Sequence, residues 1–185
     1  FIFSKLLLVD ENYNVITESK IPSNPYDINR IIMANYIDVN MIILEKSCKN
    51  KIEEILTKLR HTYFDWIFED WLIATLGLKF CIPLHVKDTH VYYRVHDYNT
   101  TFSQKVNEDP KNLFNVEREI KTLTAMLYTL TDKKLIRRVL SSLVARYTVI
   151  LSRTSKVAGV SIPIILPLAL YHVVDYIVNT RLLKR

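Results

Sequence analysis

The sequence of 185 residues is long enough to bury one sizeable hydrophobic core, and its 49% of hydrophobic residues excludes an intrinsically disordered chain. With only two glycines it cannot form a Rossmann fingerprint or a P-loop, so those two classes of nucleotide-binding fold are excluded. The net charge of +6 is compatible with a nucleic-acid partner or with an anionic membrane surface. The basic residues gather late in the chain, however, without interleaved aromatic residues that could stack on bases, so we expect no nucleic-acid partner.

The two cysteines, Cys48 and Cys81, are too few for a zinc site and form no C-x-x-C motif. We therefore expect both thiols to be reduced and the protein to be cytoplasmic, at the inner face of the membrane if its basic residues bind anionic lipid. No basic segment followed by a long apolar run opens the sequence, so no signal peptide is predicted. Because the first residues already have strand character, we expect a piece of a longer protein.

The first part of the chain predicts a hairpin, a short helix and a buried strand. Residues 1–9 have strand character, and the turn-forming residues 10–14 lead into a second strand at 15–17. Asp27 is a suitable N-cap for the short helix that follows. The β-branched apolar run at residues 39–44 predicts a buried strand.

Two helices and a strand are predicted next. Residues 48–59 place apolar side chains at helical spacing. A second helix is expected to begin at Glu69 or Asp70 and to end at Gly77, a residue type that commonly follows the last turn of a helix. Residues 89–95 predict a strand, because they are rich in apolar and aromatic residues.

The last part of the chain predicts helices only. Residues 113–130 form one expected helix and residues 133–151 a second, basic one. The apolar run at residues 157–174 has the length of a membrane span, but two prolines and a histidine interrupt it. We expect residues 157–178 either to make a peripheral contact with a membrane or to pack against protein.

Polar residues that could take part in catalysis lie at the start of the second predicted helix and at the end of the strand after it. Glu69 and Asp70 precede Trp71, and the strand ends with Arg94 and His96. A carboxylate in the first turn of a helix is stabilised by backbone N–H groups and the helix dipole, so Asp70 is a candidate general base that stays ionised. A neutral imidazole at the end of a strand can complete a divalent-cation site made of carboxylate and phosphate oxygens, so His96 is a candidate metal ligand.

These residues resemble motifs of family 2 glycosyltransferases, which have the GT-A fold. Members commonly carry an acidic pair before a tryptophan, then about one helix, then a strand that ends in Tyr-Arg-x-His and is followed by an Asn-Thr pair. The matching positions in this chain are 69–71, 93–96 and 99–100. The resemblance covers roughly residues 1–103 and corresponds to the acceptor-side, C-terminal half of such an enzyme.

The resemblance implies an α/β fold in two parts. Residues 1–109 would form a partial GT-A domain, with a mixed sheet and helices. Residues 110–185 would form an added all-α region that is basic and apolar. The Asp-x-Asp motif that holds metal and nucleotide in the family should precede the first of these residues, so the chain alone is expected to lack the donor site.

The resemblance also implies an activity. It is the transfer of a sugar, with inversion, from a nucleotide-sugar donor to a hydroxyl group of a glycan, a lipid-linked or a protein acceptor. The general base of the family corresponds to Asp70, and the histidine that completes its Mg²⁺ or Mn²⁺ site corresponds to His96. Glu69, Trp71 and Arg94 would have supporting roles.

Each of these residues also has a structural interpretation. Asp70 could be the N-cap of its helix, Glu69 a solvated first-turn charge, and Trp71 part of the core. Arg94 could pair with a buried carboxylate instead of a phosphate, and His96 could be a surface histidine. For the chain as a whole, the alternative to an enzyme is a non-catalytic module on a degenerate transferase framework that associates with membranes or oligomerises.

Overall fold

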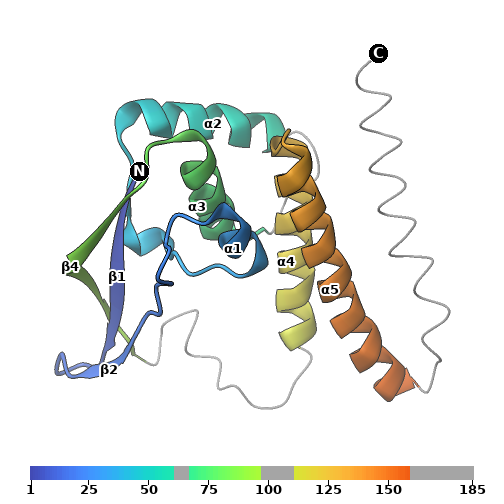
Figure 1. Cartoon of the computed structure of the whole chain (residues 1–185). Coiled ribbons are helices and arrows are strands. Elements are labelled where there is room, and N and C mark those ends of the chain that lie inside the picture. The colour runs from blue at the N-terminus through green and yellow to red at the C-terminus, as the bar shows by residue number, and fades with distance from the viewer. Residues whose placement is uncertain (61–66, 97–110, 159–185) are drawn as a thin grey trace.

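The computed structural model describes residues 1–60, 67–96 and 111–158 (Figure 1). Within them a small mixed sheet stands beside a group of helices, which confirms the predicted α/β class. The expectations for Asn99, Thr100 and the apolar residues beyond 158 lie outside the described part of the chain. The elements in chain order are β1 (Ile2–Val9), β2 (Val15–Glu18), α1 (Ile28–Met33), the 3₁₀ helix η1 (Val39–Met41), β3 (Ile42–Ile43), α2 (Lys46–Arg60), α3 (Glu69–Phe80), β4 (Leu84–Arg94), α4 (Lys111–Thr129) and α5 (Lys133–Ala158).

β1 is the central strand of the sheet. Along one edge it pairs in parallel with β4, in a register that places Ile2 opposite Leu84 and Val9 opposite Arg94. Along its other edge it pairs antiparallel, first with β3 and then with β2. The sheet is therefore mixed, as expected. The connection from β1 to its parallel neighbour β4 is long, and α3 is the last helix in it.

The predicted hairpin between β1 and β2 is confirmed, and Asp10 fixes its turn. The Oδ1 atom of Asp10 accepts hydrogen bonds from the backbone N–H groups of Asn12 and Asn14, both at 2.8 Å. Tyr13 takes a positive φ of 64° within this turn. The turn thus depends on side-chain hydrogen bonds of Asp and Asn, which replace the glycines that the sequence lacks.

α3 is the most enclosed helix, and it determines where the site lies. Leu72, Ala74 and Leu76 are fully buried, and α1, α2, α4 and η1 all contact this helix. Trp71 is only 2% exposed and donates its indole N–H to the Ile31 carbonyl. Trp71 is therefore part of the core, as the structural interpretation of this residue predicts.

The buried strand predicted for residues 39–44 is wrong. The segment forms the 3₁₀ turn η1 and only the two-residue strand β3. Asp38 starts the turn, because its carboxylate accepts from the backbone N–H of Asn40 at 2.9 Å. Val39 and Ile43 are 50% and 66% exposed, whereas Met41 is buried, so only part of this apolar run faces the core.

Gly77 does not end α3, which continues to Phe80. Its role is one of space, because a Cβ atom added at Gly77 would lie 2.7 Å from a ring carbon of Phe1. The glycine lets the start of β1 approach the helix closely. The prediction of the helix end was wrong because this contact involves a residue far away in the sequence.

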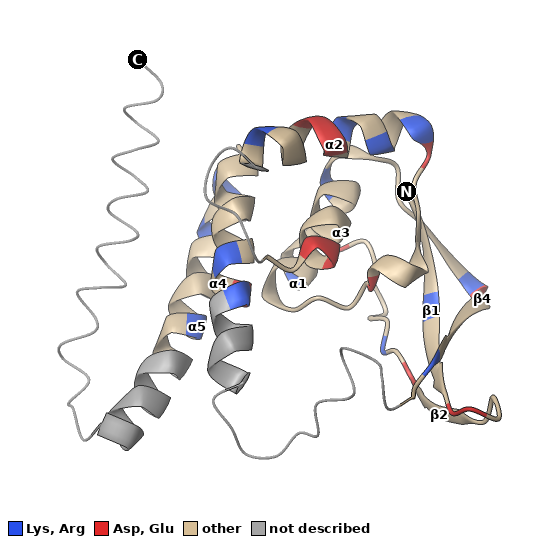
Figure 2. Ribbon diagram, turned by 180° about the vertical axis from the view of Figure 1, so that it is seen from behind, with Lys and Arg blue, Asp and Glu red and all other residues tan. Residues whose placement is uncertain are grey.

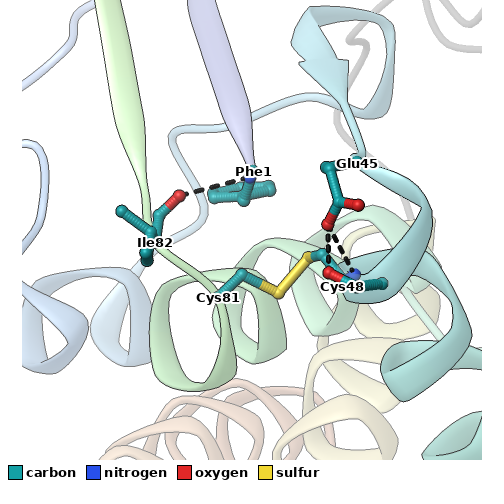
Figure 3. The surroundings of a disulfide bond; sticks show 6 residues. Phe1, Glu45, Cys48, Cys81 and Ile82 are labelled. Atoms are coloured by element: carbon teal, nitrogen blue, oxygen red, sulfur yellow. Dashed lines mark hydrogen bonds between the residues drawn. A yellow bond between two sulfur atoms is a disulfide. The ribbon is translucent and has the colours of Figure 1, made fainter.

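Cys48 and Cys81 form a disulfide bond, which contradicts the expectation of two reduced thiols (Figure 3). Their Cα atoms are 5.6 Å apart, within the range that a disulfide spans. Cys48 lies in the first turn of α2 and Cys81 directly follows α3, so the bond joins these two helices. Nearby, the amino group of Phe1 donates to the Ile82 carbonyl at 3.2 Å.

α4 and α5 form an antiparallel pair against α1 and α3, as Figure 1 shows. Leu123, Met126 and Val139 are fully buried in the same hydrophobic cluster as the core of α3. Arg146 of α5 bonds to Glu119 and donates to the Met33 carbonyl at 2.7 Å. The helices after residue 110 therefore share one core with the preceding residues. Among the described residues, no helix is both long and apolar enough to cross a bilayer.

Candidate functional site

An open cleft of about 500 Å³ lies where α3 begins. Glu69 and Asp70 line it from the first turn of α3, Val39 lines it from η1, and Arg118 lines it from α4. Ile67, just before α3, completes the wall. The cleft therefore joins the predicted acidic pair to a cation from the helical region after residue 110.

Asp70 is not the N-cap of α3. The N-cap is Phe68, whose side chain makes no capping hydrogen bond, and Asp70 lies in the first helical turn. The Oδ2 atom of Asp70 accepts a hydrogen bond from Nδ2 of Asn35 at 2.9 Å. Asn35 is itself held in place, because its Oδ1 accepts from the backbone N–H of Ile37 at 3.1 Å. The orientation of the carboxylate is thus fixed by an amide from the segment after α1.

The surroundings of Asp70 raise the pKa of its carboxyl group above the ordinary value. Burial is the largest cause, because it disfavours the charged form, and the carboxylate of Asp38 adds to the effect. Backbone N–H groups at the start of α3 and the charge of Arg118 act in the opposite direction. The helix start therefore does not keep this group as readily ionised as the sequence suggested. A carboxyl group with a raised pKa is a stronger proton acceptor.

Glu69 and Arg94 have different surroundings from Asp70. Glu69 is exposed and lines the outer part of the cleft, as a solvated first-turn charge would. Arg94 is exposed at the end of β4, and within residues 67–96 it makes no ion pair with either acid of the pair. The cation beside Asp70 is Arg118.

His96 lies two residues beyond β4, where Val95 donates its backbone N–H to the Val9 carbonyl at 2.8 Å. Among the described residues that line the cleft, neither Arg94 nor His96 is found. Across the described ranges, no three His, Cys, Asp or Glu side chains come together as a metal site requires. The structure thus places the acidic pair in the cleft, and within the described residues it assembles no metal centre with His96.

Two residues that act on Asp70 were not among the predicted site residues. Asn35 follows a short helix and is 35 positions from Asp70, and Arg118 lies in an ordinary amphipathic helix. Neither belongs to a motif, and both reach Asp70 through tertiary packing. The only sequence signal for Asn35 is its place in a polar segment that could supply a hydrogen bond to a buried carboxylate. The sequence contains no comparable signal for Arg118.

Comparison of the chain with models of protein families, with curated proteins and with solved structures gave no match. The resemblance to family 2 glycosyltransferases thus stays a prediction from the residues at 69–71, 93–96 and 99–100.

Proposed function

We propose that the chain is the acceptor-side part of an inverting glycosyltransferase with Asp70 as its general base. The observation that carries the proposal is the position of Asp70: a partly buried carboxylate, oriented by Asn35, at the wall of an open cleft. Its raised pKa suits a group that must accept a proton. The order of the motifs from Glu69 to His96, which resembles that of family 2 glycosyltransferases, also supports the proposal.

In the proposed reaction an acceptor hydroxyl group binds in the cleft beside Asp70. Its oxygen attacks the anomeric carbon of the donor sugar, while its proton passes to the Asp70 carboxylate. The bond between that carbon and the donor phosphate breaks, and the nucleoside diphosphate leaves. Attack from the face opposite the leaving group inverts the anomeric configuration. Asn35 would keep one carboxylate oxygen in place, so that the other faces the hydroxyl.

A Mg²⁺ or Mn²⁺ ion would neutralise the leaving diphosphate, but the described residues do not by themselves fit such an ion. His96 could supply one ligand, but the described residues contain no group of three His, Cys, Asp or Glu side chains that could hold a metal ion. We therefore assign no step to a metal. If His96 does bind one, His96→Ala should weaken the Mn²⁺-dependent binding of a nucleotide, measured by calorimetry. An unchanged titration would remove His96 from the site.

The proposal is tested by Asp70→Asn in the full-length protein. Loss of the proton acceptor is expected to reduce sugar transfer by roughly 10²–10⁴-fold. Donor binding should persist, because Asp70 contacts the acceptor side. Asp88→Asn, an exposed carboxylate on β4, is the matched control and should leave transfer unchanged. Full activity of Asp70→Asn would reject the assignment of the base.

A non-catalytic interaction module is the second candidate, and exposed apolar side chains favour it. Ile16 of β2, Ile43 of β3 and Ile82 before β4 are 58%, 66% and 91% exposed. Apolar side chains gathered at a surface commonly mark contacts with protein or membrane. Flotation of the full chain with anionic liposomes, together with sedimentation, tests this function. Binding that Ile82→Asp abolishes would favour the module, and a monomer that never floats would exclude it.

A further inference from the structure

α4 fixes the backbone that leads into the acidic pair. The Nη2 atom of Arg118 donates to the Ile67 carbonyl at 3.1 Å, and its guanidinium carbon lies 4.2 Å from the centre of the Phe68 ring. The hydroxyl of Thr122 accepts from the backbone N–H of Phe68 at 2.8 Å. Since Phe68 gives α3 no side-chain cap, the start of the helix is held from α4.

Arg118 also lines the cleft that contains Asp70, as does Glu69. Its Nε atom is buried and has no hydrogen-bond partner in the described part of the chain. A buried donor without a partner lowers stability, so stability alone does not explain this arrangement. Figure 2 shows the acidic start of α3 and basic residues of α4 on the same side of the molecule.

The charges around Asp70 come from several elements. Asp38, at the start of η1, opposes the ionised form of Asp70, and Arg118 of α4 favours it. Glu69 lies next to Asp70 in α3, and Asn35 contributes a neutral donor from the segment after α1. Of the charged groups on the packed helices, Lys51 of α2 lies over the Phe80 ring at the far end of α3, and Glu119 of α4 pairs with Arg146 of α5.

We propose that Arg118 is a positioning residue of this cleft, which fixes the start of α3 and supplies a positive charge that favours the ionised form of Asp70. The catalytic meaning of this contact rests on the proposed function, but the contact itself does not. The helical region after residue 110 is then a part of the site, because Arg118 of α4 lines the cleft beside Asp70 of α3.

The experiment is an NMR titration of the Asp70 carboxyl carbon in the full chain with ¹³C-labelled aspartate. The spectrum of Asp70→Asn assigns the signal. Arg118→Gln removes the charge and keeps a donor for the Ile67 carbonyl. Arg118→Met keeps the stem over the Phe68 ring, so either neutral variant gives the answer if the other does not fold. Arg118→Lys keeps the charge, and Thr122→Val removes only the hydrogen bond to Phe68.

The neutral variants are expected to shift the Asp70 titration to higher pH, whereas Arg118→Lys and Thr122→Val titrate close to the wild type. The acid side of the pH profile of sugar transfer should move in the same direction. An Asp70 titration that Arg118→Gln or Arg118→Met leaves in place would overturn the proposal. Absence of sugar transfer by the wild type would count against the glycosyltransferase, and the titration would still decide the role of Arg118.

Discussion

Asp70 has surroundings that stability alone would not select. Burial and the neighbouring Asp38 both disfavour its charge, while Arg118 and the backbone N–H groups offset only part of that cost. A carboxylate of this kind commonly belongs to a functional site, because the same surroundings make it a better base. The side-chain hydrogen bond from Asn35 gives the group a defined direction without neutralising it.

The raised pKa of Asp70 predicts a stability effect that is separate from activity. A carboxyl group whose pKa is higher in the folded state stabilises the fold at low pH, and that contribution is lost as the pH rises through the folded pKa. Asp70→Asn should therefore raise the melting temperature at pH 7, and the gain should shrink as the pH falls toward the ordinary pKa of aspartate. Its Oδ1 can still accept from Asn35. Thermal unfolding of the wild type and the variant at each pH measures this difference in melting temperature. A variant that melts at a lower temperature than the wild type at pH 7 would contradict the assigned environment.

His85 predicts a second dependence on pH. Its ring stacks on Phe3 with centroids 5.1 Å apart, and both ring nitrogens are buried without a partner in the described residues. Burial, helped by Lys87 and Lys5, lowers the pKa of His85, so the unfolded chain takes up its proton first as the pH falls. Stability should thus decline below the ordinary pKa of histidine.

Urea unfolding at pH 7.5 and at pH 5.5 measures this contribution. His85→Phe keeps a ring against Phe3 and should flatten the pH dependence of the unfolding free energy. His90→Gln changes an exposed histidine of the same strand and should leave the dependence as it is. An equal slope in wild type and His85→Phe would show that His85 is not the responsible group.

At the scale of elements, local sequence signals correctly predicted the helices and turns that local interactions determine. The hairpin, the helix after Asp27 and the helices at residues 46–60, 111–129 and 133–158 follow from turn residues, caps and apolar spacing. The η1 turn and the end of α3 were mispredicted, because Asp38 and the Phe1 ring outweigh the composition of those segments. Of the site, the acidic pair and its helix could be predicted. Its partners could not, because packing alone brings them together.

Gly77→Ala tests the close approach of Phe1 to α3. Alanine is favoured over glycine inside a helix by about 1 kcal/mol. The added Cβ atom, however, would lie 2.7 Å from the buried ring of Phe1, and overpacking of this kind costs about 1–3 kcal/mol. We expect net destabilisation in chemical unfolding, which Phe1→Leu in the same chain should relieve. A stabilised Gly77→Ala would show that the ring moves aside freely.

At the scale of the whole molecule, one core and one disulfide hold the helices together. The buried cluster extends from Phe1 to Leu143, so α4 and α5 stabilise the same unit that carries the acidic pair. The Cys48–Cys81 bond links α2 to the end of α3, across 33 positions of sequence. Arg118 can act on Asp70 only because this shared core holds α4 against α3.

The disulfide predicts a dependence of stability on reductant. A loop of this length lowers the entropy of the unfolded chain, which corresponds to about 3–4 kcal/mol of stabilisation. Treatment with dithiothreitol should lower the unfolding midpoint in urea, and the Cys48→Ser, Cys81→Ser double variant should match the reduced wild type. Alkylation of the native chain followed by mass spectrometry is the direct check. Labelling of both cysteines in the absence of reductant would contradict the disulfide bond.

The central claim is that Asp70 accepts the proton of the acceptor hydroxyl group. The pH dependence of kcat/KM for sugar transfer by the full-length protein tests it most directly, because this parameter reports the pKa of the essential base in the free enzyme. The account predicts an acid limb whose midpoint coincides with the separately measured titration of Asp70, above the ordinary value for aspartate. Transfer that stays constant while Asp70 becomes protonated would contradict it.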